Sequence, residues 1–357
     1  DWRAGYGPIA HRSETIERMQ ALVQRLVAQR RIADEASAHA LLAAADRVAC
    51  TAMSVVAHMT YARRIDRSGC PLGSDDFKQT PEGHTGGSLN MVPAFVGYLL
   101  ANALTGTTRG WLMGQGHCVA AIEAVNALTG DVSAAQRGRY DRSEAGLSRL
   151  IADFYSYAID KQGRPAVPLG SHAGPNTAGA ISEGGYLGFA GLQYVHTPLP
   201  GESLVAFLSD GAFEEQRGSD WAPRWWRAED CGFAIPVMIL NGRRIEQRTQ
   251  IVQEGGATWL AEDLRHNGFD PVIVDGRDPM AIAWAIVEAE DTLSAFAARS
   301  DRRYPVKLPY VIAETEKGFG FPGAATNAAH NLPLDGNPRE DAQAREAFNA
   351  GAAALFV

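Results

Sequence analysis

The sequence has 357 residues, of which 46% are hydrophobic and 21% are charged. This is the balance of a globular protein with a substantial core, and it excludes a disordered or fibrous chain. Lys and Arg number 33 against 41 Asp and Glu, which gives a formal net charge of −8. A general attraction to nucleic acid or to an anionic membrane is therefore not expected.

The sequence also suggests neither a membrane span nor a secretion signal. No run approaches the roughly 18 apolar residues that a span needs, and residues 1–30 carry charges throughout instead of a signal-peptide pattern. The four cysteines show no C-x-x-C spacing and are too few to cross-link a chain of this size. We therefore expect a cytoplasmic protein.

The first part of the chain is predicted to be helical. Between residues 13 and 64, apolar side chains recur at helical spacing, which indicates two or three helices. No convergent polar group occurs there, so residues 1–65 are expected to form a helical lead-in that packs on the rest of the chain.

The middle part alternates short glycine-rich turns with long apolar helices. Residues 83–87 precede a helix predicted over 89–104, and residues 114–116 precede one predicted over 119–128. Turns of this kind point the N-termini of helices at a common ligand.

From residue 201 onward, strands and helices are predicted to alternate. Four apolar runs bounded by turns predict buried parallel strands, at 203–208, 235–240, 271–274 and 310–314. Helical stretches at 257–267 and 279–298 lie between them. We therefore predict an α/β fold for residues 66–357, a doubly wound parallel sheet with helices on both faces.

Two polar residues follow successive predicted strands at the point where each strand ends. Asp210 and Asn241 are each followed by Gly, and the spacing between them fits a helical crossover and a return strand. Both are therefore expected at the carboxyl edge of the sheet, where Gly211 allows close backbone approach. A carboxylate and a neutral oxygen suit Mg²⁺ (or Ca²⁺) carrying a diphosphate better than zinc. Alone, Asp-Gly or Asn-Gly is only a common turn dipeptide.

Four of the nine histidines stand in loops rich in Gly, Pro or Asn: His84, His117, His172 and His330. Loop histidines beside glycine are poor packing residues. An imidazole near a diphosphate and a sugar can hydrogen-bond both and move protons near pH 7. Any one of them could equally be a surface histidine. The other five are expected to be structural: His11, His39, His58, His196 and His266.

The spacing of Asp210 and Asn241 resembles the thiamine-diphosphate signature, in which Gly-Asp-Gly is followed after nearly thirty residues by Asn. Ser209 stands here where the signature has its first Gly. The resemblance implies that the metal would be held by Asp210, Asn241 and the main-chain carbonyl of Arg243.

Four further segments resemble phosphoketolases. The run SHAGPNTAGAISEGGYLGFA (171–190) is similar to that family's segment built on Ser-His, Thr-Pro-Gly and Glu-Gly-Gly-x-Leu-Gly-Tyr. WLMGQGHC (111–118) is similar to its Gly-Pro-Gly-His, and ILNGRRI (239–245) to its Leu-Asn-Gly-Tyr-Lys-Ile. KGFGFPG followed by AAHNLPL (317–334) resembles its late loop, which ends in a His before Pro-Leu.

Two segments depart from the phosphoketolase pattern. The loop GHTGGS (83–88) is closer to the Gly-His-x-Gly of transketolases than to Gly-His-Trp-Gly, and SDGAFEE (209–215) replaces Gly-Asp-Gly-Glu-Ala-Glu. The main expectation is thiamine-diphosphate-dependent cleavage of a ketose phosphate that forms acetyl phosphate. The alternatives are transketolase-type transfer of two carbons to an aldose, and a non-catalytic regulatory subunit that keeps the cofactor fold.

The resemblance also implies roles for individual residues. His84 and His117 would face the substrate, His330 the diphosphate and substrate hydroxyls, and His172 the cofactor or substrate. The residues expected to bind the cofactor are Gly116, Ser209, Gly211, Ala212, Asn241 and His330.

The resemblance covers residues 76–334, which correspond to the diphosphate-binding domain of such enzymes. Their pyrimidine-binding domain, which supplies the Glu that activates the cofactor, has no match in the chain. We therefore expect that Glu to come from a partner subunit or from a further part of a longer protein. The other expected partners are a sugar phosphate, inorganic phosphate and further subunits of a homo- or hetero-oligomer.

Overall fold

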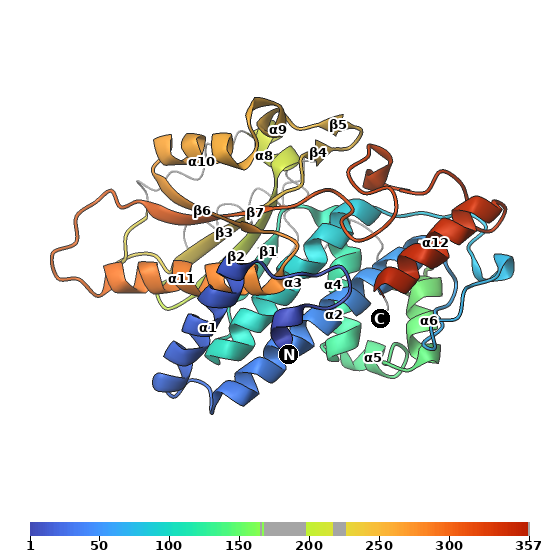
Figure 1. Ribbon diagram of the computed structural model, residues 1–357, viewed down its shortest axis with the longest axis horizontal. Helices are drawn as coiled ribbons and strands as arrows, with labels where there is room; N and C mark the ends of the chain where they lie inside the picture. Colours follow the sequence, from blue (N-terminus) through green and yellow to red (C-terminus); the bar gives the residue numbers. More distant parts are fainter. Residues whose placement is uncertain (165, 168–197, 217–225, 356–357) are drawn as a thin grey trace.

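A parallel β-sheet forms the centre of the structure, a computed structural model that describes residues 1–164, 166–167, 198–216 and 226–355 (Figure 1). Five strands pair in the order β1-β2-β3-β7-β6, all parallel. Their bounds are Gly110–Met113 (β1), Ser203–Ser209 (β2), Phe233–Leu240 (β3), Leu308–Glu314 (β7) and Phe269–Asp275 (β6). A short antiparallel pair, β4 (Arg243–Arg244) and β5 (Gln247–Arg248), follows β3.

Helices surround this sheet. Their bounds are α1 Ser13–Ala28, α2 Glu35–Tyr61, α3 Thr85–Thr105, α4 Val119–Thr129, α5 Ala134–Arg137, α6 Glu144–Asp153, α8 Asp210–Gln216, α9 Gln250–Glu254, α10 Ala257–His266, α11 Pro279–Ala297 and α12 Ala342–Leu355. Single 3-10 turns lie at Trp2–Ala4 (η1), Ser74–Asp76 (η2), Gly116–Cys118 (η3) and Ala328–His330 (η5).

The strands bury both of their faces because their apolar residues alternate between two cores. Val205 and Phe207 of β2 join the larger core, which includes α2, α3 and α11. Leu204 and Ala206 of the same strand join a smaller core with α10. In Figure 1, α10 and α11 lie on opposite sides of the sheet. The predicted doubly wound α/β sheet is therefore confirmed.

The predicted strands and helices match observed ones closely, but several short elements were not predicted, among them β4, β5, α5, α6 and α9. The four predicted strands correspond to β2, β3, β6 and β7, and the predicted helical lead-in to α1 and α2. The sequence analysis missed β1, a strand of only four residues at the edge of the sheet. Helix α2 shares its core with α3, and the division of the chain at residue 65 stays a prediction.

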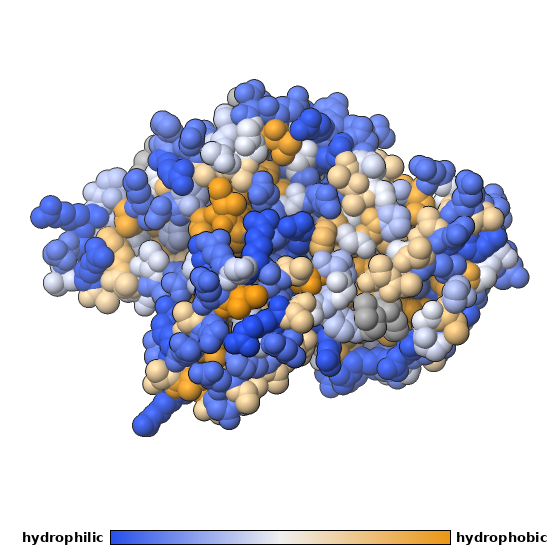
Figure 2. Space-filling view, viewed as in Figure 1, coloured by the Kyte–Doolittle hydropathy of each residue, from blue (hydrophilic) through white to orange (hydrophobic). Residues whose placement is uncertain are grey.

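Helices α2 and α3 are long and apolar enough, by length and composition, to cross a membrane. This corrects the expectation that no run approaches the length of a span. Most of the apolar window of each helix is buried inside the protein, as in core helices in general, so the finding is weak evidence for a span. The face seen in Figure 2 is mainly hydrophilic, with apolar residues scattered over it.

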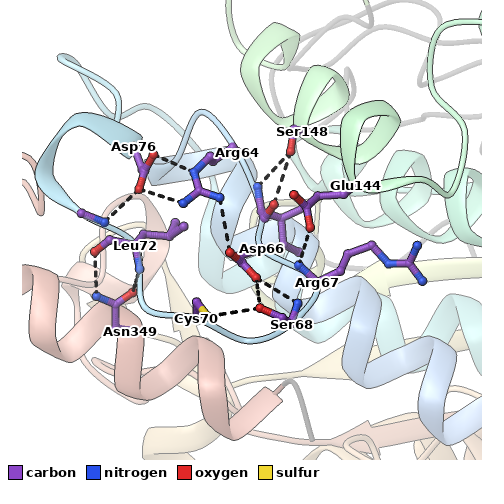
Figure 3. Close-up of polar contacts among 12 residues, drawn as sticks. Arg64, Asp66, Arg67, Ser68, Cys70, Leu72, Asp76, Glu144, Ser148 and Asn349 are labelled. Carbon is purple, nitrogen blue, oxygen red and sulfur yellow. Dashed lines mark hydrogen bonds and ion pairs between the residues drawn. The ribbon is translucent and has the colours of Figure 1, made fainter.

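The loop between α2 and α3 is held by polar contacts within itself and with α6 and α12 (Figure 3). The Arg64 guanidinium donates to both carboxylate oxygens of Asp76 inside this loop. Ser148 of α6 accepts from the main-chain N–H of Ile65, and Asn349 of α12 bonds to both main-chain polar groups of Leu72. These contacts hold residues 65–72 of the loop against α6 and α12.

A buried histidine fixes the N-terminal segment to the rest of the core. The His11 ring nitrogens lie 3.0 Å from a carboxylate oxygen of Asp46 on α2 and 2.9 Å from one of Asp278, which caps α11. Burial alone would lower the pKa of His11, but the hydrogen bonds and charges of Asp278 and Asp46 outweigh it and raise this pKa to about 10. An imidazolium donating to two carboxylates therefore joins three segments.

We predict that His11→Leu lowers the free energy of unfolding by about 3–5 kcal/mol, because it leaves two buried carboxylates without their cation. The wild-type stabilisation should be complete below pH 6.5 and should be lost as the pH rises toward about 10, since the folded-state pKa is the higher one. Urea unfolding at several pH values measures both effects. His266→Ala, at an exposed position, is the control. Equal stability of His11→Leu and wild type would contradict the prediction.

Candidate functional site

A pocket lies at the carboxyl ends of β1, β2 and β3, the edge where open α/β sheets bind ligands. Segments that are far apart in the sequence meet there. The described residues that line it are His84, Gly87, Gln115, His117, Cys118, Ser209, Gly211, Ala212, Ile239, Asn241, Arg243, Arg244, Ile245, Lys317 and His330. Among these there is no acidic side chain, whereas three are cationic, so the pocket favours an anionic ligand.

Three of the four loop histidines meet in this pocket. The ring centroids of His84 and His117 lie 5.2 Å apart, and His330 lies 5.6 Å from His84 and 5.5 Å from His117. They come from the start of α3, from η3 and from η5. His172 lies outside the described residues.

Four of the other five histidines lie elsewhere in the described part of the chain. His58 is buried in α2 and donates to the carbonyl of Ser54, and His266 donates to the carbonyl of Glu262. His11 is the buried imidazolium described above, and His39 lies near Trp2. His196 falls outside the described residues.

Asp210 is buried directly behind the pocket, at the junction of β2 and α8. One carboxylate oxygen accepts from the main-chain N–H of Gly242 at 2.7 Å, and the other accepts from that of Gly211 at 3.1 Å. Burial raises the pKa of Asp210 to about 7, against the opposing effects of these N–H donors and of Lys317. This carboxylate thus connects the ends of two adjacent strands and changes charge near neutral pH.

Asn241 and Arg243 follow β3 on the same edge. The side-chain oxygen of Asn241 accepts from the main-chain N–H of Arg243 at 3.1 Å, and the Arg243 carbonyl lies 3.5 Å from Nζ of Lys317. The Arg243 guanidinium donates to the side chain of Asn327, next to η5. The sequence-predicted metal ligands therefore lie close to the segment that carries His330.

Lys317 is a buried cation that the sequence analysis did not single out. Its Nζ donates to Nδ1 of His330 at 2.8 Å. Burial, then the charge of Lys317 and that of His84, lowers the pKa of His330 to about 3. His330 is therefore a neutral imidazole that accepts at Nδ1 and carries its proton on Nε2.

The predicted cofactor-binding residues Gly116, Ser209, Gly211 and Ala212 all lie at this edge of the sheet. The Ser209 hydroxyl, which stands where the signature has Gly, accepts from the main-chain N–H of Ala212 at 3.3 Å. A Cβ on Gly211 would lie 2.8 Å from Cβ of Arg244, so this glycine also permits close packing of α8 against β4. Gly116 is buried and begins η3. Their contact with a cofactor stays a prediction.

A glycine on α3 allows the segment carrying His330 to approach. A Cβ on Gly86 would lie 2.1 Å from the carbonyl oxygen of Ala329, far inside a normal contact. The hydroxyl of Thr85 donates to the carbonyl of Asn331 at 2.7 Å and strengthens the same contact. The GHTGGS loop is thus needed for packing as well as for presenting His84.

We predict that Gly86→Ala destabilises the protein by roughly 1–3 kcal/mol, because the new methyl group forces α3 and η5 apart. Gly138→Ala is the matched control, since a Cβ there meets no heavy atom within 4 Å. Thermal and urea unfolding of the two variants measure the difference. Equal stabilities would show that the two segments separate without cost.

Comparisons with known proteins point to one family. The family model described as XFP N-terminal domain matches residues 37–349. A probable phosphoketolase of Streptomyces coelicolor is 32% identical over 228 residues, which are 57% of this chain and 27% of that protein. One of Mycolicibacterium paratuberculosis is 28% identical over 302 residues, 77% of this chain and 36% of that protein. The chain spans about a third of the length of these curated relatives.

Solved structures of transketolases also match. A transketolase variant from Pichia stipitis aligns with 87% of this chain and 44% of its own, at 16% identity and a TM-score of 0.45. A transketolase from Leishmania mexicana aligns with 86% of this chain and 44% of its own, at 15% identity and a TM-score of 0.43.

Proposed function

Because the chain belongs to the XFP N-terminal domain family, we propose that it supplies the diphosphate-binding half of a thiamine-diphosphate- and Mg²⁺-dependent enzyme. The complete enzyme would cleave a ketose phosphate and form acetyl phosphate, as phosphoketolases do. The observation that supports this best is the convergence of His84, His117 and His330 in a cationic pocket, next to the Asp210 and Asn241 pair.

The residues of the pocket, together with Asp210 buried behind it, fit a metal-bound diphosphate. Asp210, Asn241 and the Arg243 carbonyl offer a carboxylate, an amide oxygen and a main-chain oxygen, the hard donors that Mg²⁺ and Ca²⁺ prefer. Lys317 and Arg244 add positive charge beside them, as a diphosphate needs. Lys317 Nζ, already bonded to His330, would face the diphosphate together with that histidine.

The histidines would act as general acids and bases in the reaction. When bound, thiamine diphosphate supplies the nucleophilic carbon that adds to a ketose carbonyl. His84 and His117 are close enough to each other to hold and pass protons at the substrate's oxygens. His330, kept neutral by burial and Lys317, would donate its Nε2 proton in a hydrogen bond to the diphosphate or a substrate hydroxyl.

The Glu that activates the cofactor would come from outside this chain. The matched segments make up only 27% and 36% of the lengths of two phosphoketolase relatives. The family model is that of an N-terminal domain. A pyrimidine-binding domain or subunit would therefore complete the site. Two copies of this chain alone would bring the same half twice.

Transketolase-type transfer to an aldose is the second candidate, and the GHTGGS loop favours it. Thr85 stands where phosphoketolases have Trp, and its side chain bonds to Asn331 and Thr60 instead of filling the pocket. A site without that bulky ring leaves more room for a second sugar.

We predict that Asp210→Asn weakens binding of thiamine diphosphate with Mg²⁺ by about 100-fold, because the metal loses its one side-chain anion. Since the pKa of Asp210 is about 7, wild-type affinity should fall below pH 7, where the metal must displace a proton, and should level off above it. Calorimetric titration from pH 5.5 to 8.5 measures both. Asp301→Asn, at an exposed position, is the control. Unchanged affinity of Asp210→Asn would contradict the prediction.

We predict that the chain alone turns over no ketose phosphate, and that the enzyme completed by a pyrimidine-binding partner forms acetyl phosphate. The substrates are fructose 6-phosphate or xylulose 5-phosphate with inorganic phosphate, and the product is trapped as a hydroxamate. His117→Ala should lower this rate more than it lowers cofactor affinity, because proton movement is lost while the diphosphate contacts remain.

Two results would overturn these expectations separately. Turnover by the chain alone would refute the need for a second half. Conversion of ribose 5-phosphate to a seven-carbon ketose without acetyl phosphate would favour the transketolase candidate.

A further inference from the structure

Gln115 is a pocket residue that the proposed function leaves without a role. It lies between β1 and His117 in the run WLMGQGHC, at the position where the phosphoketolase motif has Pro. Gln115 lines the pocket and is only 3% exposed. The chain therefore carries a buried amide at a place where a proline would offer no polar side-chain atom.

The amide makes weak contacts through its nitrogen only. Nε2 lies 3.5 Å from the carbonyl oxygen of Leu208 on β2 and 3.9 Å from Sδ of Met91 on α3. Oε1 is buried and has no hydrogen-bond partner in the described part of the chain. Exchanging the two atoms would set Oε1 against the Leu208 carbonyl, an unfavourable contact between two acceptors. The orientation with an unpaired oxygen is therefore the better one.

An unpaired buried acceptor destabilises the ligand-free protein. Gln115 lines the pocket, so a ligand bound there is the group that could bring a donor to it. Gln115 thus prepares the pocket for a ligand that brings an N–H or O–H group to the end of β1.

The sheet order indicates which part of a ligand lies there. Asp210 and Asn241 follow β2 and β3, whereas Gln115 follows β1, the strand on the far side of β2. Neighbouring strands are about 4.8 Å apart, so the ends of β1 and β3 are separated by about 10 Å. A ligand whose diphosphate lies at β3 would place its other end near Gln115.

We propose that Oε1 of Gln115 accepts a hydrogen bond from the amino group on the pyrimidine ring of thiamine diphosphate. This rests on the proposed function, because it takes the diphosphate to lie at the Asn241 end of the pocket, after β3. Gln115 is then a residue of this chain that recognises the ring end of the cofactor, the end that the missing half also contacts.

The test uses Gln115→Met, which keeps the side chain's length and removes the acceptor. Gln253→Met, at an exposed position on α9, is the matched control. Each protein is titrated calorimetrically to millimolar concentrations of thiamine diphosphate and, separately, of inorganic pyrophosphate, both with Mg²⁺. Pyrophosphate has the same anionic group and no amino group.

We expect Gln115→Met to bind thiamine diphosphate about tenfold more weakly than wild type, with pyrophosphate affinity unchanged. Gln253→Met should bind both ligands nearly as wild type does. The ligand-free Gln115→Met protein should melt at the wild-type temperature or above it, because it no longer buries an unpaired acceptor.

Three outcomes would overturn the proposal. Unchanged affinity of Gln115→Met for thiamine diphosphate would show that no such bond forms. An equal loss for both ligands would show that the residue acts on the anionic end or on the fold. Wild-type protein that binds neither ligand would overturn the proposed function itself. If the wild type binds pyrophosphate, either of the first two results overturns only the role of Gln115.

Discussion

The buried carboxylate of Asp210 is the contact on which the arrangement of the pocket depends. It accepts hydrogen bonds from the main-chain N–H groups of Gly211 and Gly242. These bonds join the carboxyl ends of β2 and β3 and fix where the chain leaves each strand. Burial makes the charged form costly and raises the pKa to about 7. A cation bound beside such a carboxylate stabilises its ionised form and offsets the free-energy cost of burying the charge.

The rest of the pocket is built by bringing distant segments to this edge. The segment with Lys317 and His330 packs on the start of α3 through a close approach that Gly86 permits. Lys317 then lies between His330 and the Arg243 carbonyl, so that a cation, a neutral imidazole and a main-chain oxygen share one side of the pocket. Outside the pocket, His11 holds the N-terminal segment to α2 and α11 by the same principle of buried charges paired at short distance.

The sequence predicted the sheet well because buried parallel strands are continuous apolar runs between turns, a pattern that needs no tertiary information. Strand β1 was missed because it has only four residues, three of which belong to the motif WLMGQGHC, and they show no period of their own. The meeting of His84, His117 and His330 followed from the resemblance of their loops to known motifs, since spacing along the chain could not indicate it. His172 lies outside the described residues, so its expected place beside them stays a prediction.

Other residues could not be found from the sequence because their significance arises from packing. Lys317 is an ordinary lysine until burial and the partners His330 and Arg243 are known. Gln115 stands out in its motif only as a replacement for Pro, and its unpaired oxygen depends on where Leu208 and Met91 lie. The ion pairs of His11 join residues that are far apart in the chain, a separation that no local pattern can bridge.

The central claim is that this chain holds the diphosphate end of thiamine diphosphate at the carboxyl edge of its sheet. The most direct measurement is a crystal structure of the protein soaked with millimolar thiamine diphosphate and Ca²⁺, with the metal located by its anomalous signal. The account predicts one Ca²⁺ bound by Asp210, Asn241 and the Arg243 carbonyl, with the diphosphate beside Lys317 and His330. Calcium or cofactor at another place, with this pocket free of both, would contradict it.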